Sequence, residues 1–202
     1  MTTPVVMTTP KDMETIKRKV REVARLVSRK VFINFHPNTL TIIGFIITCY
    51  ASLLYASGVF WLGGIVLLIG GMFDIIDGEV AKLTNKSSKF GAFLDSCVDR
   101  YSDFIILFGM FCWYYNIEQT LPIILIFLAI LGSYIVSYTR ARAEGLGIEC
   151  KVGLGERGVR IPIIIIGSLF GSKIFIGFLL VIALLTNITG VYRIWWVWRK
   201  IK

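Results

Sequence analysis

Long apolar segments alternate with short polar ones along most of the chain. Six of them predict membrane-spanning helices, at about residues 39–57, 60–83, 91–115, 122–143, 161–170 and 173–196. A span needs roughly 20 residues of α-helix. The segment 161–170 is too short, so we expect its helix to extend back into 156–160. The pattern therefore predicts an all-α integral membrane protein with six transmembrane helices.

A different pattern precedes the first of these segments. Between residues 11 and 36, apolar residues such as Val20, Val23, Val27 and Val31 recur every three or four positions, with lysine and arginine between them. This spacing is typical of an amphipathic juxtamembrane helix lying on an anionic membrane surface. A solvated helix packed on another subunit is the alternative.

The expected organisation has four parts. They are a disordered N-terminus at 1–10, a cytoplasmic amphipathic helix at 11–36, a six-helix transmembrane domain at 37–198 and a basic cytoplasmic tail at 199–202. The first part contains the tetrapeptide MTTP twice and no apolar core of a signal peptide.

Charge indicates the orientation and narrows the partners. The net charge is +9, although 55% of the residues are hydrophobic. With six spans and both ends inside, the basic residues near the span ends are cytoplasmic except Lys173, as the positive-inside rule requires. The charge thus indicates membrane lipids and phosphates, not nucleic acid, as partners. The single histidine, His36, and four cysteines without metal-binding spacing argue against a zinc site.

Four aspartates, Asp74, Asp77, Asp95 and Asp99, lie between the apolar segments. Within each pair, a spacing of three or four residues places both side chains on one helix face. The short polar segment 84–88 separates the two helices, so the acidic faces should meet near one membrane surface. Each charge costs about 2.5–3.5 kcal/mol at the centre of a span, and Mg²⁺, Mn²⁺ or Ca²⁺ would compensate it. Solvated carboxylates at the membrane edge are the alternative.

A second polar group follows in the last third of the chain. It consists of Ser137, Arg140, Arg157, Arg160 and Arg193. Guanidinium groups bind phosphate through a planar fork. The group therefore predicts a phosphate-bearing polar substrate on the same side as the aspartates. Ordinary positive-inside charge, or snorkelling to lipid headgroups, is the alternative.

The aspartates belong to a longer motif. The segments DIIDGEVAK at 74–82 and GAFLDSCVD at 91–99 resemble the signature of the CDP-alcohol phosphotransferase (CDP-alcohol phosphatidyltransferase) family. That signature is D-x2-D-G-x2-A-R, about eight residues, then G-x3-D-x3-D, and Lys82 replaces its arginine without supplying the bidentate fork. The segments 137–147 and 152–160 resemble the branch that makes phosphatidylinositol phosphate, including its archaeal, archaetidylinositol counterparts.

The resemblance implies a reaction and a role for each residue. CDP-diacylglycerol or CDP-archaeol would transfer a phosphatidyl-type group to inositol 1-phosphate and release CMP, in phospholipid biosynthesis. Two divalent ions, Mg²⁺ or Mn²⁺, would be held by Asp74, Asp77, Asp95 and Asp99, with Asp99 also the catalytic base. The implied CDP-donor site consists of Asn38, Thr41, Asp77, Gly78, Ala81, Lys82 and Gly91, and the implied acceptor-phosphate site of Ser137, Arg140, Arg157, Arg160 and Arg193. The resemblance also implies a homodimer in the cell membrane whose active site faces the cytoplasm.

Two alternatives remain. The first keeps this chemistry with another acceptor, such as glycerol 3-phosphate, or with a non-lipid CDP-alcohol as donor. The second belongs to another class, a cation transporter or channel that uses the four aspartates as its ion site. Intramembrane carboxylates do mark ion pathways, but such a protein would not need the arginine group.

Overall fold

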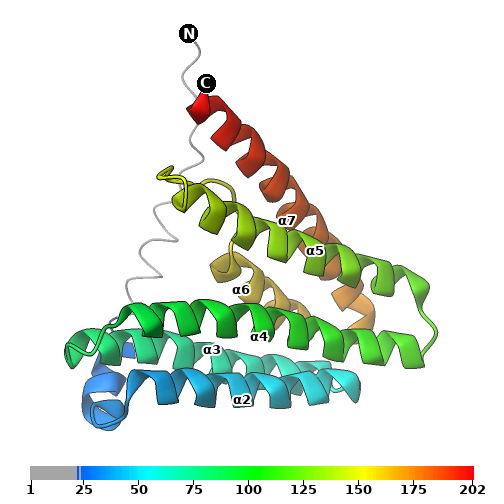
Figure 1. The fold of residues 1–202 in the computed structure, drawn as a ribbon. Helices are drawn as coiled ribbons and strands as arrows, with labels where there is room; N and C mark the ends of the chain where they lie inside the picture. Colours follow the sequence, from blue (N-terminus) through cyan, green and yellow to red (C-terminus); the bar gives the residue numbers. More distant parts are fainter. Residues whose placement is uncertain (1–21, 23) are drawn as a thin grey trace.

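The computed structural model describes residue 22 and residues 24–202. All regular secondary structure in this part of the chain is helical, without strands. The elements are the short π-helix η1 (Ser28–Phe32) and the α-helices α2 (Pro37–Ala56), α3 (Phe60–Leu83), α4 (Lys89–Asn116), α5 (Thr120–Glu144), α6 (Arg157–Ser168) and α7 (Gly171–Ile201) (Figure 1). The N-terminus expected at 1–10 and most of the basic helix expected from residue 11 lie outside the described residues.

Each apolar segment identified in the sequence forms one of the six α-helices, α2 to α7. Four of these, α2, α3, α5 and α7, are long and apolar enough to cross a membrane. The helix α4 is long, but charged residues occupy its first half. The helix α6 begins at Arg157 and has only 12 residues, which is about 18 Å at the α-helical rise. The protein is therefore a multi-pass membrane protein, and spanning by α4 and α6 stays a prediction.

The helices form two groups. The helix α2 packs against both α3 and α4, whereas α5 packs against α7 (Figure 1). The groups meet where α4 contacts α5 and where α6 contacts α3 and α7. Their common core includes edge-to-face aromatic contacts, with the ring of Phe60 5.3 Å from Tyr55 and 5.9 Å from Tyr114 between centroids. Such ring pairs add to the stabilisation that burial already gives.

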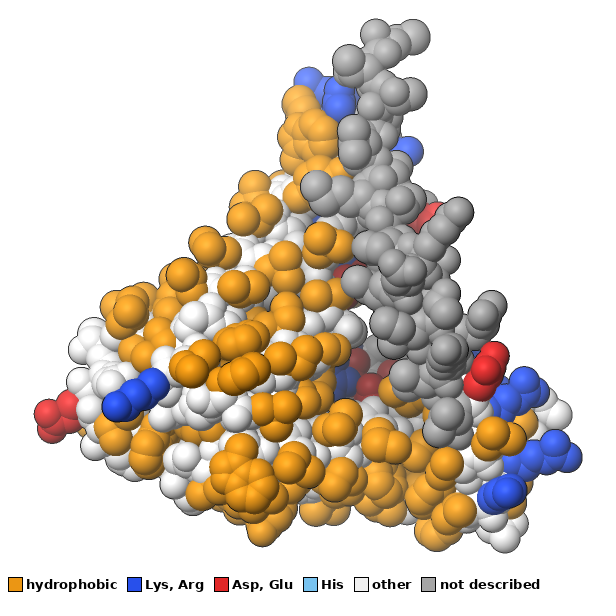
Figure 2. All heavy atoms as spheres, turned by 180° about the vertical axis from the view of Figure 1, so that it is seen from behind, with side chains coloured by type: hydrophobic (Ala, Val, Ile, Leu, Met, Phe, Trp, Pro, Cys, Tyr) orange, Lys and Arg blue, Asp and Glu red, His pale blue; other side chains and the backbone are white. Residues whose placement is uncertain are grey.

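One side of the molecule collects the polar connections. The start of α2, the turn between α3 and α4, the α5–α6 connection and the end of α7 all lie toward the left of Figure 1. Seen from behind, hydrophobic side chains cover the middle of the molecule, and lysine and arginine side chains gather at the corresponding end (Figure 2). This distribution suits a lipid-facing belt with one basic end.

The described part of the N-terminal segment packs against α3. Val27 and Phe32 contact a small core cluster that contains Leu40 and Ile76, and the Ser28 hydroxyl donates to the Ile76 carbonyl at 3.5 Å. Val31, expected on the same apolar face as Val27, is exposed instead. The π-helical turn at 28–32 shifts the register, so the packed face continues through Phe32.

Close contact between α2 and α4 depends on Gly109. A β-carbon at this position would overlap the backbone carbonyl of Ser52, which cannot rotate away. We predict that Gly109→Ala lowers the free energy of unfolding by about 1–3 kcal/mol, because overpacking forces the two helices apart. Thermal unfolding in detergent measures this, and an unchanged midpoint would contradict it. Gly177→Ala on α7 is the matched control, since a β-carbon there meets nothing within 4 Å.

Candidate functional site

A helical hairpin brings three of the four predicted aspartates together. Its turn ends where the Ser88 hydroxyl accepts a hydrogen bond from the Gly91 backbone N–H at 2.9 Å and caps the start of α4. Asp74 on α3 and Asp95 and Asp99 on α4 then face one another, and each offers a carboxylate oxygen within 4.8 Å of the other two. We call these three residues the carboxylate triad.

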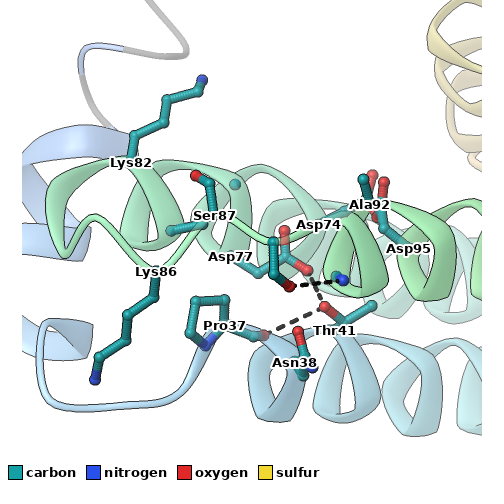
Figure 3. A pocket seen from close by; sticks show the side chains of 14 residues that line it. Pro37, Asn38, Thr41, Asp74, Asp77, Lys82, Lys86, Ser87, Ala92 and Asp95 are labelled. Atoms are coloured by element: carbon teal, nitrogen blue, oxygen red, sulfur yellow. Dashed lines mark hydrogen bonds between the residues drawn. The ribbon is translucent and has the colours of Figure 1, made fainter.

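Asp77 is oriented differently. Its Oδ2 accepts a hydrogen bond from the Thr41 hydroxyl of α2 at 2.5 Å (Figure 3), and it is not a member of the triad. Thr41 belongs to the first turns of α2, which Pro37 starts as a residue well suited to a helix N-terminus. The fourth aspartate is thus tied to a third helix.

An arginine compensates part of the negative charge of the triad. Arg157, the first residue of α6, is 3.3 Å from both carboxylate oxygens of Asp74 through its Nη1 atom and forms an ion pair with Asp99. Asp99 Oδ1 is nevertheless buried and makes no hydrogen bond to the described residues. Arg100 lies 3.8 Å from the other oxygen of Asp99. Like charges this close repel strongly in a partly buried site, so two arginines leave the three carboxylates under-compensated.

The triad has the chemistry of a site for a hard divalent cation. All its donors are carboxylate oxygens, which suit Mg²⁺, Mn²⁺ or Ca²⁺ better than a soft metal. The Asp99 oxygen that pairs with Arg157 is buried, so a cation bound there would be shielded from water. Residues and donor set therefore fit a divalent ion.

A cavity of about 270 Å³ adjoins the triad at the hairpin turn. All seven residues expected at the donor site line it, namely Asn38, Thr41, Asp77, Gly78, Ala81, Lys82 and Gly91. A β-carbon at Gly78 would meet nothing within 4 Å, and one at Gly91 would come within 3.2 Å of Asn38 Oδ1. Both glycines thus keep the wall of the cavity free of side chains.

Lys82 is the departure from the family signature, and it points away from the aspartates (Figure 3). Its ammonium group donates to Glu79 at 2.9 Å, and 67% of its side chain is exposed. Lys86 lines the same cavity from the turn. Lysine side chains are flexible, so either could reach an anion in the cavity by rotation.

An apolar groove leads away from the triad along α3 and α6. Asp74, Asp99 and Arg157 form its polar end. Its remaining lining is largely apolar and includes Leu68, Met72, Ile75, Ile161 and Ile165. With a volume of about 390 Å³, the groove offers a path for an aliphatic chain that starts at the carboxylates.

A third, polar cavity of about 190 Å³ lies beyond Arg157, and all five residues expected at the acceptor site line it. They differ in availability. Arg140 and Arg157 have 40% and 21% of their side chains exposed, whereas Arg160 and Arg193 have 3% and 1%. A wider hollow between α4 and α5, which Ser137 and Arg140 also line, adjoins the cavity.

Arg193 and Arg160 are bound within the protein. Arg193 donates to the carbonyls of Val152 and Val136 and to Glu156, at 2.7–2.9 Å. Arg160 donates to the Gly155 carbonyl at 2.5 Å and to Asp103. The two buried arginines therefore form the floor of the cavity, and Arg140 and Arg157 are its accessible cations.

Two residues of this region were not singled out in the sequence. Asp103 lies one turn beyond Asp99 on α4 and binds Arg160, so the spacing Asp95, Asp99, Asp103 would have revealed it. Glu156 joins Arg140 and Arg193 by ion pairs of 3.7 and 2.9 Å. No spacing in the sequence identifies this second contact, because it depends on how α7 meets the α5–α6 connection.

Titratable groups of that connection lie outside the helices. Burial raises the pKa of the Cys150 thiol, so the thiol stays protonated near neutral pH and is a poor nucleophile. A hydrogen bond from Lys151 lowers the pKa of the exposed Glu149. Neither residue lines the cavities and the groove described above.

Comparison with known proteins agrees with this geometry. The chain is 42% identical over 182 residues to an archaetidylinositol phosphate synthase of Pyrococcus horikoshii, which covers 89% of this chain and 93% of the relative. The phosphatidylinositol phosphate synthase PgsA1 of Mycobacterium tuberculosis has a similar fold. Its crystal structure with CDP-DAG bound has a TM-score of 0.78 and 27% identity, covering 90% of this chain and 94% of that one.

A second PgsA1 structure contains manganese and citrate. It has a TM-score of 0.77 and 28% identity, covering 89% of this chain and 88% of that one. Residues 34–199 of the present chain match the sequence profile of the CDP-alcohol phosphatidyltransferases. The match includes the carboxylate triad, the donor-side cavity and the arginines of α5, α6 and α7, and the chain is therefore a member of the CDP-alcohol phosphatidyltransferase family.

Proposed function

We propose that this enzyme transfers a phosphatidyl-type group from CDP-diacylglycerol or CDP-archaeol to inositol 1-phosphate and releases CMP. The observation that carries the proposal is the position of the carboxylate triad. It lies where three sites meet: a cavity lined by the family signature, an apolar groove and an arginine-lined cavity. A donor with a nucleotide and a lipid, and an acceptor with a phosphate, require this arrangement.

The donor fits the first two sites. The cytidine and diphosphate would occupy the cavity beside Asn38, Thr41 and Gly78, where missing side chains leave room. The lipid chains would follow the apolar groove between α3 and α6. The lipid-side phosphorus would then lie beside the triad. The names of the archaeal relative and the CDP-DAG complex of PgsA1 support this donor.

The acceptor fits the arginine-lined cavity. Its lining contains five arginines, including Arg100, and three acids, Asp99, Asp103 and Glu156, which leaves two net positive charges. A phosphate monoester carries close to two negative charges at pH 7. Inositol 1-phosphate, with its phosphate against Arg140 and Arg157, would therefore neutralise the cavity. The hollow between α4 and α5 offers an entrance.

Asp99 is the residue placed to take the proton. It lines both the acceptor cavity and the groove, so the acceptor hydroxyl and the lipid-side phosphorus would meet there. The hydroxyl oxygen forms a bond to that phosphorus, the bond from phosphorus to the CMP oxygen breaks, and the hydroxyl proton passes to Asp99. Mg²⁺ or Mn²⁺, as two ions at Asp74, Asp77, Asp95 and Asp99, would stabilise charge on the diphosphate when bound. The PgsA1 structure with manganese supports such ions.

The setting of the site completes the proposal. All six α-helices, α4 and α6 included, would form the transmembrane catalytic domain at 37–198. The helix at 11–36 and the tail at 199–202 would lie on the cytoplasmic surface. The basic end of the molecule (Figure 2) supports a site that faces the cytoplasm of the cell membrane. The enzyme would act as a homodimer, as the family resemblance implies. Family membership favours the enzyme over the cation transporter.

The test is CMP release by purified protein in detergent, with CDP-archaeol or CDP-diacylglycerol, Mn²⁺ and inositol 1-phosphate. Release of CMP with glycerol 3-phosphate but not with inositol 1-phosphate would support the same transfer reaction with a different acceptor. We predict that Asp99→Asn lowers the rate by at least about a hundredfold, because general-base catalysis contributes that much or more. Glu118→Gln, at the opposite end of the bundle, should keep the wild-type rate. Full activity of Asp99→Asn would exclude Asp99 as the base.

A second prediction concerns Arg157 as a resident counter-ion of the triad. Arg157→Gln should bind Mn²⁺ roughly tenfold more tightly in the absence of substrates, because the ion no longer competes with a guanidinium at a few ångströms. Electron paramagnetic resonance of free Mn²⁺ measures the affinity. Arg142→Gln removes an exposed charge from the end of α5 and should leave the affinity unchanged. Equal or weaker binding by Arg157→Gln would refute the competition.

A third prediction concerns Arg140. Its guanidinium is held by Glu144 at 2.9 Å but remains 40% exposed at the acceptor cavity. Arg140→Gln should raise the KM for inositol 1-phosphate roughly tenfold, the loss expected for one charge-assisted hydrogen bond. The KM for the CDP-lipid should stay the same. Initial-rate kinetics measure both constants, and a parallel rise in the two would place Arg140 elsewhere in the mechanism.

A further inference from the structure

Asp103 is a buried acid at the polar end of the bundle, and it forms ion pairs with two arginines. It lies on α4, one turn beyond Asp99, and only 9% of its side chain is exposed. A buried carboxylate is costly unless it is paired and hydrogen-bonded. Each of its oxygens has a different partner. Oδ2 accepts a hydrogen bond from Arg160 Nη2, and Oδ1 lies 3.4 Å from Arg157 Nε in an ion pair without a hydrogen bond.

This arrangement fixes two guanidinium groups relative to each other. Arg160 is also held by the Gly155 carbonyl through Nη1, so it is clamped between α4 and the α5–α6 connection. The contacts of Arg157 use Nε for Asp103 and Nη1 for Asp74 and Asp99. One carboxylate therefore sets where both arginines stand on the wall of the acceptor cavity, which all three residues line.

We propose that Asp103 is a positioning residue for the acceptor: its carboxylate holds Arg160 in the floor and Arg157 in the wall of the cavity, so that the cavity keeps the arrangement that binds the acceptor phosphate. The inference rests on the proposed function for the identity of the acceptor, but the hold on the two arginines does not. Asp103 reaches the substrate only through the arginines. It is also distinct from the carboxylate triad, whose three members do not include it.

Charge and position predict opposite effects of removing this carboxylate. Asp103→Asn makes the cavity more positive by one unit, and if only net charge mattered it would bind a phosphate more tightly. If Asp103 acts by position, the asparagine holds the guanidinium groups less firmly and phosphate binding weakens. The sign of the change in acceptor KM therefore separates the two.

The first experiment measures both Michaelis constants of Asp103→Asn in detergent. We expect the KM for inositol 1-phosphate to rise roughly tenfold or more, as for loss of a hydrogen bond between charged groups, with the KM for CDP-lipid unchanged. Glu149→Gln, which removes one exposed negative charge beside Lys151, is the matched control and should change neither constant. A lower or unchanged acceptor KM in folded Asp103→Asn would overturn the proposal.

A double variant guards against misfolding. Asp103→Asn leaves the Arg160 charge buried without its partner, and removing one member of a buried pair is worse than removing both. Asp103→Asn combined with Arg160→Gln should therefore fold at least as well. Because Asp103 acts in part through Arg160, the double variant should raise the acceptor KM by less than the product of the effects of Asp103→Asn and Arg160→Gln alone. An acceptor KM at the wild-type value in the folded double variant would overturn the proposal.

The second experiment does not depend on the acceptor. Phenylglyoxal modifies accessible arginines, and peptide mass spectrometry reads each site. Arg157 and Arg160 should be modified several times faster in Asp103→Asn than in the wild type, with Arg142 as the internal control. If modification is faster in Asp103→Asn but the wild type does not use inositol 1-phosphate as acceptor, Asp103 positions the arginines and the proposed acceptor is wrong. Unchanged modification of both arginines in the folded variant would overturn the proposal.

Discussion

The repulsion among aspartates that face one another inside a largely apolar bundle is the constraint on which the rest of this structure depends. Asp74, Asp95 and Asp99 approach within 4.8 Å, where like charges in a partly buried site destabilise the fold by several kcal/mol at an effective dielectric near 20. Among the described residues, Arg157 at the start of α6 pairs with Asp74 and Asp99, and Arg100 lies 3.8 Å from Asp99. The positive end of the α6 dipole points the same way. What remains uncompensated is a driving force for binding divalent ions.

The short helix α6 connects the apolar groove with the arginine-lined cavity because its N-terminus enters the polar end of the bundle. Arg157 separates the apolar groove from the arginine-lined cavity and lines both. Three residues later, Arg160 is anchored under the same cavity. A longer helix would carry these residues past the aspartates. The 12-residue length of α6 is therefore what places its charges.

Local spacing predicted much of the site, whereas long-range packing decided the rest. The helix positions and the meeting of Asp74, Asp95 and Asp99 follow from periodicity and a short polar turn. The orientation of Asp77 toward Thr41 does not, since it depends on how α2 packs between its neighbours. Likewise, no sequence pattern distinguishes the exposed Arg140 from the buried Arg193, because burial of Arg193 depends on carbonyls from two other segments. Asp103 follows Asp95 and Asp99 at the same four-residue spacing, but it lies beyond the end of the family signature.

The apolar groove between α3 and α6 has a consequence for how such an enzyme would encounter its substrate. Leu68 and Met72 of its lining are exposed, so aliphatic chains would enter it sideways from the bilayer without crossing water. Encounter would then be a two-dimensional diffusion process within one leaflet. Saturation would depend on the mole fraction of the donor among the lipids and not on its concentration in the bulk solution. Diluting the same micelles or vesicles with inert lipid would slow the enzyme, whereas adding buffer would not.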